Sequence, residues 1–474
     1  MKLHGEVQHR ALRLKLIACV LLALAVGSAA RLAAGIAAAQ SPRQRQYAQQ
    51  QQAAAITPAP PIVASDTPNS AEQQAKHYVI LVSLDGFRYD YTQQYDAVNL
   101  KELATSGASS PDGMLPAYPS ITFPNHLSIV TGLYPEHHGI VANVFYDPAR
   151  QQIYSYRDPQ TVTDGSWYGG TPLWVLAEQQ GMRAACFFWP GSEAAVQGTR
   201  PSYYMQYNPK YPNDDRVKQV LAWLQLPPPL RPHFITLYFS DVDSAGHAHG
   251  PDSPQVASAV HEVDQEIGAL QAGLAKLNLP VDVIVLADHG MIEVEGDWID
   301  LDQYFHRSLL EESVETLMYA KSGADAAKIY AQLNGKSDKF RVYRRGHMPE
   351  SLHFDQNPRE GDPIVVPTGP FLLRVSQPPP PSAAGAAGNP MAAGHGNEPP
   401  VGMHGYDPAH MPQMKAIFYA AGPDIRGGAT VPPFENVNVY PLIAHILRLD
   451  IANLKTGPID GKLAVLQSIL KNPD

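Results

Sequence analysis

The hydrophobic residues of the chain fall into short continuous runs, and longer amphipathic stretches separate these runs. Continuous apolar runs without polar alternation are typical of strands buried on both faces of a sheet. They lie at Tyr78–Leu84, Arg183–Phe188, Phe234–Phe239, Val281–Ala287 and Ala416–Ala420. The stretches that predict helices are Leu127–Gly132, Thr171–Gln180, Ser253–Leu277 and Asn438–Leu449. Strands alternating with helices predict an α/β fold in which a mostly parallel central sheet carries helices on both faces.

The first 39 residues have the pattern of a targeting signal. Basic residues between positions 10 and 15 precede an apolar run over residues 16–27, and small residues follow up to Ala39. This order is typical of a cleaved signal peptide. We therefore expect residues 1–39 to be removed and the protein to be periplasmic or secreted in a bacterium. The alternative is an uncleaved membrane anchor, but the run is short for a span, so no stable membrane span is expected.

Changes in composition divide the rest of the chain. Residues 40–76 are rich in Gln, Ala and Pro without apolar periodicity, and they predict a flexible leader. The folded domain is expected to span residues 77–474. Within it, residues 293–402 show weaker patterning and predict a less regular insert, a small cap region on the main sheet. The Pro-, Ala- and Gly-rich stretch 377–400 of that insert predicts a mobile surface loop.

Composition and charge narrow the class of protein. With 17% charged and 44% hydrophobic residues over 474 positions, the chain is neither a disordered protein nor a small disulfide scaffold. The formal charge of −10 argues against a broad nucleic-acid-binding surface, so no sequence-specific nucleic-acid partner is expected. Cys19 lies in the expected signal peptide, which leaves Cys186 without an intramolecular partner. None of these features predicts the oligomeric state.

Acidic residues directly follow three of the predicted strands, and histidines accompany two of these groups. They are Asp85 after the first strand, Asp241, Asp243 and His247 after the third, and Asp288 and His289 after the fourth. The carboxyl ends of parallel strands meet at one edge of a sheet, and this is where open α/β sheets bind their ligands. Carboxylates gathered there repel one another unless cations hold them, and adjacent histidines favour a borderline metal such as zinc.

A hydroxyl group precedes the shortest of the predicted helices, in the sequence Thr122-Phe123-Pro124-Asn125-His126. Backbone N–H groups and the helix dipole favour anions near a helix N-terminus. A metal ion can lower the pKa of a hydroxyl group and make it a nucleophile. Taken alone, Thr122 also fits a helix cap or a core threonine.

These segments and several others resemble the type I nucleotide pyrophosphatase/phosphodiesterase family of the alkaline phosphatase superfamily. The resemblance runs in the family's order from about residue 77 to the end: Leu84–Arg88, Thr122–His126, Thr131-Gly132, His137–Ile140, Asn143, Phe188–Glu193, Asp243–His247, Ala287–Met291 and His404–Tyr406. Each motif is short, and the ordered set makes the resemblance specific. It implies an alkaline-phosphatase-like fold, a catalytic domain over residues 77–474 and two Zn²⁺ cofactors.

The resemblance also implies a role for individual residues. One zinc ion would be held by Asp85, Thr122, Asp288 and His289, and the other by Asp243, His247 and His404. Thr122 would be the nucleophile, and Asn143 would donate a hydrogen bond to a phosphoryl oxygen. Phe123 would form one wall of the substrate pocket, Tyr207 the opposite wall, and Trp189 a further part of the wall.

Several of these assignments have competitors that residue chemistry alone does not exclude. The competitors are Asp241 for Asp243, His249 for His247 and His395 for His404. An i,i+4 pair such as Asp243 and His247 converges on one ion if the segment is helical. The Gly405-Tyr406-Asp407 sequence favours His404. Three more histidines match family positions and are interpreted as structural residues: His126, His137 and His138.

The implied reaction is hydrolysis of a nucleotidyl phosphodiester or phosphoanhydride bond through a covalent threonyl intermediate, for example of a nucleoside triphosphate to the monophosphate and pyrophosphate. Some family members prefer lysophospholipids or choline phosphodiesters, and Phe123 suits an acyl chain as well as a base. A phosphate monoesterase is another interpretation, but it needs extra positive charge, and both neighbours of Thr122 are apolar. A non-catalytic metal-bearing binding protein would keep the ligands and lack the nucleophile.

Overall fold

The structure is a computed structural model that describes residues 59–375 and 399–472. The expected signal peptide (1–39), the first part of the leader (40–58) and residues 377–398 of the expected surface loop lie outside the described residues. His395 lies outside them as well. None of the helices in the described ranges is long and apolar enough to cross a membrane.

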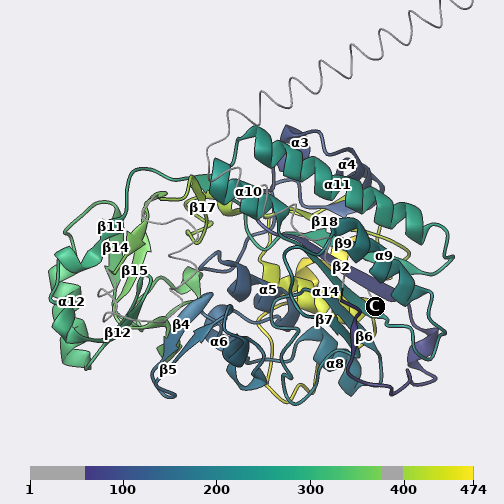
Figure 1. Cartoon of the computed structure of the whole chain (residues 1–474), viewed down its shortest axis with the longest axis horizontal. Helices are drawn as coiled ribbons and strands as arrows, with labels where there is room; N and C mark the ends of the chain where they lie inside the picture. Colours follow the sequence, from purple (N-terminus) through teal and green to yellow (C-terminus); the bar gives the residue numbers. More distant parts are fainter. Residues whose placement is uncertain (1–58, 376–398, 473–474) are drawn as a thin grey trace, which may run out of the picture. The chain divides into compact units, whose positions relative to one another are not determined.

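A large twisted sheet forms the centre of the fold (Figure 1). Within the described residues it has nine strands, in the order β1 (Ile62–Val63), β7 (Tyr203–Met205), β6 (Ala184–Phe187), β8 (Phe234–Phe239), β2 (Tyr78–Leu84), β9 (Val281–Leu286), β18 (Phe418–Ala421), β3 (Ala108–Ser109) and β19 (Ala429–Thr430). The central strands are parallel, and Val82 of β2 faces Leu237 of β8 and Val285 of β9. All seven residues of β2 are buried, as its continuous apolar run predicts.

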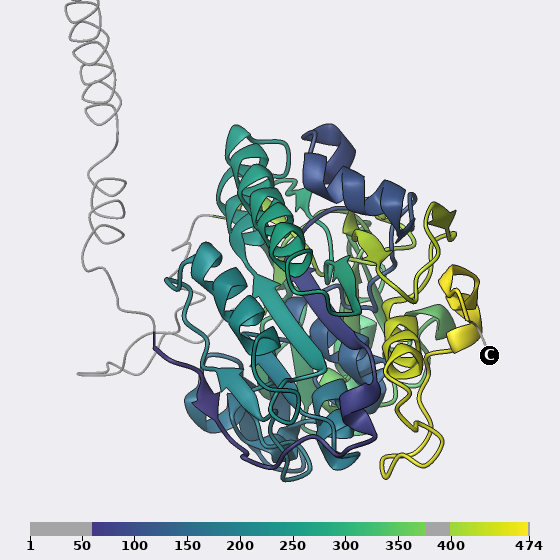
Figure 2. The ribbon, with the colours of Figure 1, turned by 90° about the vertical axis from the view of Figure 1, so that its right-hand side faces the viewer.

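Helices cover both faces of the sheet, which confirms the predicted architecture. Helices α4 (Val98–Ser106), α9 (Asn213–Leu224) and α11 (Pro254–Leu274) form one layer, and α5 (Thr122–Thr131), α8 (Leu173–Gln179) and α14 (Val439–Ile446) form the other. In the turned view of Figure 2, the purple strand β2 lies between the teal helix α11 and the yellow helix α14. Helix α11 begins where its Ser-Pro sequence predicts, because the Ser253 hydroxyl accepts a hydrogen bond from the Val256 N–H.

Strand β18 is antiparallel to β9, so the sheet is mostly parallel, as predicted. One helix differs from its sequence prediction. Helix α5 begins at Thr122, five residues before the predicted start. The sequence pattern hides this start because Pro124 normally ends a helix, whereas in a first turn its missing N–H has no partner to lose. The helix ends at Gly132, whose φ of 68° is left-handed.

The segment from residue 60 to residue 76 is packed on the sheet, which corrects its assignment to a flexible leader. Strand β1 pairs with β7. Asn69 is buried, donates hydrogen bonds to the carbonyls of Pro228 and Arg231, and accepts one from the Arg183 N–H. The Asn69 side chain bonds to main-chain groups of its partners, so no apolar pattern in the sequence signals these contacts.

The insert forms a lobe with a hydrophobic cluster of its own around Leu301, Met318, Ile329 and Leu333. It contains the pairs β11 (Ile299–Asp300) with β16 (Leu373–Arg374), β12 (Leu310–Val314) with β13 (Leu317–Ala320), and β14 (Phe340–Tyr343) with β15 (Ile364–Pro367), together with α12 (Gly323–Leu333). Figure 1 shows this lobe in green, beside the hairpin of β4 (Val144–Asp147) and β5 (Gln152–Ser155). Strand β10 (Ile292–Glu293) pairs with β17 (Gly402–Met403) where the insert joins the main sheet.

Candidate active site

The carboxyl ends of β2, β8 and β9 bring the acidic residues of the sequence analysis to one edge of the sheet. Asp85 directly follows β2, and Asp288 and His289 follow β9. After β8 the chain forms α10 (Asp241–His249). Gly86 has a φ of 68°, and a Cβ atom there would lie 2.8 Å from the Cα of Asp243, so glycine permits this close approach.

One cluster joins Asp85, Asp288, His289 and Thr122. The His289 Nε2 atom lies 3.1 Å from Oδ2 of Asp288, 3.5 Å from Oδ1 of Asp85 and 3.3 Å from the Thr122 hydroxyl oxygen. Asp85, Asp288 and His289 are buried. Four of the residues predicted to share one metal ion are therefore adjacent in the fold.

Burial and crowding shift the pKa values of these carboxyl groups in opposite directions. Burial, followed by the charges of Asp288 and Asp243, raises the pKa of Asp85 well above its usual value. Burial alone would raise the pKa of Asp288, but the charges of His289 and His126 hold it well below its usual range. Carboxylates this close need positive charge between them, which protons or cations can supply.

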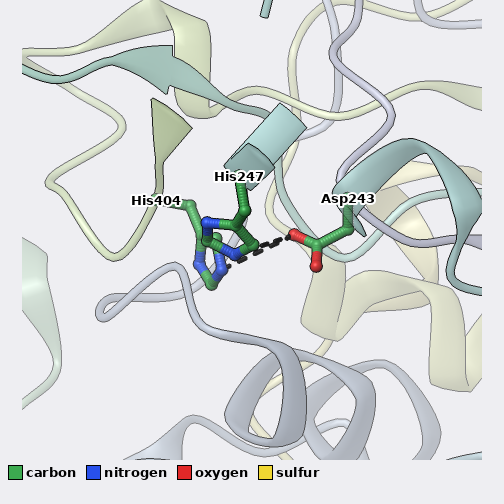
Figure 3. Close-up of side chains that lie close together, drawn as sticks. All are labelled: Asp243, His247 and His404. Carbon is green, nitrogen blue, oxygen red and sulfur yellow. Dashed lines mark ion pairs between the residues drawn. The ribbon is translucent and has the colours of Figure 1, made fainter. Parts of the chain in front are cut away.

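The second cluster joins Asp243, His247 and His404 (Figure 3). Both imidazole rings point toward the Asp243 carboxylate, whose Oδ1 lies 3.3 Å from Nε2 of His247 and 3.7 Å from Nε2 of His404. Asp243 and His247 are one helical turn apart on α10, so their side chains converge. The His404 ring stacks on that of His289 with centroids 3.6 Å apart, which places the two clusters side by side.

Backbone carbonyls orient all three histidines in the same way. The Nδ1 atoms of His247, His289 and His404 lie within hydrogen-bonding distance of the carbonyls of Gly402 (2.9 Å), Gly290 (3.0 Å) and Ser120 (2.8 Å). A carbonyl only accepts, so each Nδ1 carries the proton in these bonds, and a neutral ring then offers its Nε2 lone pair. Burial, with His289 and His247 nearby, lowers the pKa of His404 well below its usual value and keeps that ring neutral.

The donor set fits two metal ions. Buried oxygen atoms of three carboxylates have no hydrogen-bond donor: Oδ1 of Asp85, Oδ1 of Asp243 and Oδ2 of Asp288. Unsatisfied buried oxygens are costly, and a cation satisfies them. Asp243 also lies within ligand distance of Asp85 and His289, so its carboxylate links the two clusters. Imidazole nitrogens combined with carboxylate oxygens suit zinc.

Thr122 is the first residue of α5 and does not act as its cap. The N-cap residue is Ile121, and no side chain caps this end of the helix. The hydroxyl of Thr122 instead faces His289. Asn143 lies beside it, because its side-chain carbonyl accepts the Phe123 N–H at 3.0 Å. The amide NH₂ of Asn143 is the remaining donor, and the residue borders the cavity above the clusters.

The cavity above the two clusters has a volume of about 1330 Å³ and lies between the main sheet and the insert. Phe123 and Tyr156 pack together in its wall with ring centroids 5.3 Å apart. Tyr207 also borders the cavity, and 47% of its surface is exposed. Trp189 also borders the cavity, and its buried indole N–H donates to the His126 carbonyl, so this bond holds Trp189 in the wall.

The competing candidates Asp241 and His249 lie on α10 with Asp243 and His247, but outside the two clusters. Asp241 accepts a hydrogen bond from Asn213, and neither Asp241 nor His249 belongs to a cluster of ligating groups in the described residues. The Nε2 atom of His126 lies 2.9 Å from the Ser83 hydroxyl, and its Nδ1 lies 3.4 Å from Oδ2 of Asp288. His126 therefore contacts the proposed metal ligand Asp288 and is a structural residue of the site, as predicted. His137 pairs with Asp460, and the His138 ring contacts Ser128.

Three residues of the site were not predicted from the sequence. Tyr238 donates a hydrogen bond of 2.5 Å to Asp85, Ser120 orients His404 through its carbonyl, and Tyr156 packs against Phe123. Tyr238 is the penultimate residue of β8, the strand that leads into the site, and this position alone only weakly predicts a residue of the site. Ser120 acts through its main chain, and Tyr156 lies in a turn after the β4–β5 hairpin, so the sequence marks neither residue.

Comparison with known proteins agrees with this geometry. Residues 79–407 match the family model of type I phosphodiesterase/nucleotide pyrophosphatase. The chain belongs to this family. The venom phosphodiesterase of Macrovipera lebetinus is 34% identical over 431 residues, which cover 86% of this chain and 47% of that protein. The human ectonucleotide pyrophosphatase/phosphodiesterase family member 1 is 34% identical over 414 residues, or 83% of this chain and 42% of that protein.

The chain thus spans about half the length of the curated type I phosphodiesterase/nucleotide pyrophosphatase relatives that it matches. Among solved structures, murine ectonucleotide pyrophosphatase/phosphodiesterase 5 has a TM-score of 0.73 at 28% identity, covering 83% of this chain and 100% of that chain. An inactive threonine-to-alanine variant of the murine protein in complex with AMP gives a TM-score of 0.73 at 27% identity, with coverage of 84% and 100%. These similarities confirm the predicted family and the alkaline-phosphatase-like fold.

Proposed function

We propose that this protein hydrolyses nucleotidyl phosphodiester or phosphoanhydride bonds with Thr122 as its nucleophile. The observation that carries the proposal is the position of the Thr122 hydroxyl. It lies at the start of α5, 3.3 Å from His289, beside two clusters of carboxylates and imidazoles. The venom phosphodiesterase and ectonucleotide pyrophosphatase relatives support this reaction class.

Asp85, Asp288 and His289 would hold one zinc ion together with Thr122, and Asp243, His247 and His404 would hold the other. The unsatisfied oxygen atoms of the three carboxylates and the common orientation of the histidines support this assignment. When bound, the two ions lower the pKa of the Thr122 hydroxyl and stabilise negative charge on the phosphoryl and leaving oxygens.

The protein's own groups position the reaction. The Thr122 hydroxyl first releases its proton to water, and its oxygen then attacks phosphorus. The bond from phosphorus to the leaving oxygen breaks, the leaving group departs with the bonding electrons, and a threonyl-nucleotide forms. Water then hydrolyses this ester and restores the hydroxyl group. The amide NH₂ of Asn143 donates to a non-bridging phosphoryl oxygen, because the other end of its side chain is fixed on the Phe123 N–H. The Phe123–Tyr156 wall offers a face on which a nucleobase stacks.

The cavity supports a diesterase over a monoesterase. A phosphate monoester carries a second negative charge that a monoesterase meets with extra cationic groups. Arg157 and Arg374 are the arginines among the described residues that border the cavity, and no described lysine borders it. Arg374 pairs with Asp300, and Arg157 stacks over the Tyr156 ring, so neither is committed to the phosphoryl site.

The reaction class is tested with bis(p-nitrophenyl) phosphate and p-nitrophenyl phosphate as paired substrates of the zinc-loaded protein. We expect strong preference for the diester, loss of activity on chelation and recovery with zinc. Thr122→Ala should lower kcat at least about 10³-fold, because it removes the attacking group, and Thr122→Ser should keep measurable turnover. Preference for the monoester would transfer the protein to the phosphatase branch, and full activity of Thr122→Ala would refute the nucleophile.

A nucleotide is the substrate we propose, since AMP is bound in the related murine structure. Lysophospholipids and choline phosphodiesters are the second candidate, because the aromatic wall also suits an acyl chain. Comparison of kcat/KM for a nucleoside triphosphate, a lysophosphatidylcholine and glycerophosphocholine separates them. A higher value for either lipid-derived substrate would contradict the nucleotide assignment.

We also propose that the protein is exported to the periplasm or secreted, with residues 1–39 removed. The support is the order of basic, apolar and small residues at this end of the chain. N-terminal sequencing of protein from the host that produces it naturally should begin near residue 40. An intact residue 1 would contradict cleavage.

A further inference from the structure

A second group of ligating side chains lies at the opposite end of the central strands. His77 directly precedes β2, Asp282 is the second residue of β9, and Asp424 follows β18. Strands β2, β9 and β18 are consecutive neighbours in the sheet, so each contributes one side chain. The length of β2 separates this group from the candidate active site by roughly 20 Å, at about 3.3 Å per residue.

Asp282 is the residue that requires an explanation. Its side chain is fully buried, and its Oδ2 atom has no hydrogen-bond donor. Its Oδ1 accepts the Asp424 N–H at 3.0 Å. The main chain approaches closely at Gly422, where a Cβ atom would lie 2.3 Å from Oδ1 of Asp282. The fold thus holds a buried carboxylate oxygen in place without a hydrogen-bond donor from the described residues, an arrangement that costs free energy unless a further group completes it.

The neighbours of Asp282 are groups that bind metals. One atom each from His77, Asp282 and Asp424 lies within 4.8 Å of the others. The His77 Nδ1 atom lies 2.6 Å from Oδ2 of Asp424. The charge of Lys471 acts on Asp282, but its ammonium group donates to the carbonyls of Gly422 and Pro423. The side chains of His77 and Asp424 are 39% and 23% exposed, so water can complete a coordination shell.

We propose that His77, Asp282 and Asp424 form a further divalent-metal site that takes zinc and ties three neighbouring strands together at the end of the sheet away from the active site. One imidazole nitrogen, two carboxylate oxygens and water make up a donor set that suits zinc. The buried Oδ2 of Asp282 supplies the inner ligand, and the two half-exposed side chains close the site from outside. The role is structural, because the site is remote from Thr122.

The competing explanation is a proton shared by the two carboxyl groups. Burial, with Asp424 nearby, raises the pKa of Asp282 to about 8. A shared proton would make stability depend on pH and leave it independent of zinc, whereas a metal site makes stability depend on zinc. The two explanations are therefore separable in one set of melting experiments.

The test uses full-length protein in which Asp243→Ala and His289→Ala remove ligands of both active-site clusters. Four proteins are compared: this double variant itself (the background protein), and the double variant with His77→Ala, with Asp282→Asn or with His410→Ala added. His410 is the matched control, since its Nδ1 also lies 2.6 Å from an aspartate Oδ2, that of Asp407, and no described carboxylate joins this pair in a group of three ligating residues. Zinc content per chain is measured after dialysis, and the thermal midpoint is measured with zinc and with EDTA.

We expect the background protein to keep one zinc ion per chain and to gain about 2–5 °C in thermal midpoint with zinc. His77→Ala and Asp282→Asn should lose both the ion and the gain, and His410→Ala should keep both. Asp282→Asn replaces a carboxyl group by a neutral group of the same shape, so it tests the site without opening a cavity. Equal zinc content in all four proteins would overturn the proposal. A midpoint that follows pH and ignores zinc would also overturn it.

Discussion

Asn143 shows how one side chain serves both the fold and the reaction. Its Oδ1 accepts the N–H of Phe123, the residue next to the nucleophile, and this bond orients its amide NH₂. The residue follows no strand-end pattern, and only the family resemblance singled it out. Its proposed role depends on the donor end of the amide, which can be altered separately from the acceptor end.

Asn143→Ala and Asn143→Asp test this division. The aspartate keeps an acceptor for the Phe123 N–H but replaces the donor by a negative charge facing the phosphoryl oxygens. Both variants should lower kcat for the diester by about 10²–10³-fold, the usual effect of losing one donor to a transition-state oxygen. Near-normal kcat in Asn143→Asp would show that only the contact with Phe123 matters.

At the scale of elements, the helical conformation of α10 selects between pairs of equivalent residues. Asp241 and Asp243 are chemically alike, but two residues along a helix turn a side chain by about 200°. Asp243 thus faces His247 and His404, whereas Asp241 bonds to Asn213.

The substitutions Asp243→Asn and Asp241→Asn compare these two positions directly. Asp243→Asn should reduce kcat/KM at least about 10²-fold and lower the zinc content, because an amide is a poorer metal ligand than a carboxylate. Asp241→Asn should stay within about threefold of wild type, since the amide oxygen still accepts from Asn213. Activities and zinc contents of the purified variants decide the matter, and the reverse ranking would contradict the assignment.

A short turn in the insert carries a pH-dependent contribution to stability. Glu360 is buried in the 3-10 helix Pro358–Glu360, where its side chain accepts the Asn357 N–H. Burial, followed by Glu136 and Asp355, raises its pKa to about 9. The folded protein therefore keeps a proton that the unfolded chain releases near pH 4.5, and this stabilisation is lost as the pH rises toward 9.

Glu360→Gln should remove that dependence. Between pH 5 and pH 9, Glu360 should contribute a fall in the free energy of unfolding with a slope of up to about 1.4 kcal/mol per pH unit. Urea unfolding of wild type and variant at several pH values measures the difference. Parallel curves for the two proteins would show that Glu360 does not titrate in this way.

The sequence predicts the strands and the site best where a continuous apolar run is followed directly by acidic residues. The buried runs locate β2 and β8 to the residue, and acidic residues at strand ends identify one edge of the sheet as the site. The sequence pattern does not predict that α5 begins at Thr122, because Pro124 normally indicates the end of a helix. Tyr156 escapes prediction as well, because its contact with Phe123 joins a turn after β5 to the first turn of α5, and the two segments share no sequence pattern.

At the scale of the whole molecule, the segment before β2 is part of the fold. Arg183 donates to the carbonyls of Ser65 and Thr67, and Asn69 bridges this segment to the ends of β6 and β8. Composition misses this packing because the segment is short, polar and rich in proline.

Asn69→Ala should lower the free energy of unfolding by about 2–4 kcal/mol, since it removes three hydrogen bonds and leaves buried main-chain groups unpaired. Thr67→Ala is the control, because Thr67 is exposed and acts through its carbonyl, and it should change stability by less than about 0.5 kcal/mol. Equilibrium denaturation measures both. Equal stability of the two variants would mean that the segment is not anchored through Asn69.

The central claim is that Thr122 attacks the phosphorus that bears the nucleoside. Hydrolysis of ATP by the zinc-loaded protein in ¹⁸O-labelled water tests it most directly, with products identified by mass spectrometry. The proposal predicts AMP and pyrophosphate as first products, with the label in AMP, and no turnover by Thr122→Ala. ADP and orthophosphate as first products, or label in the pyrophosphate, would contradict it.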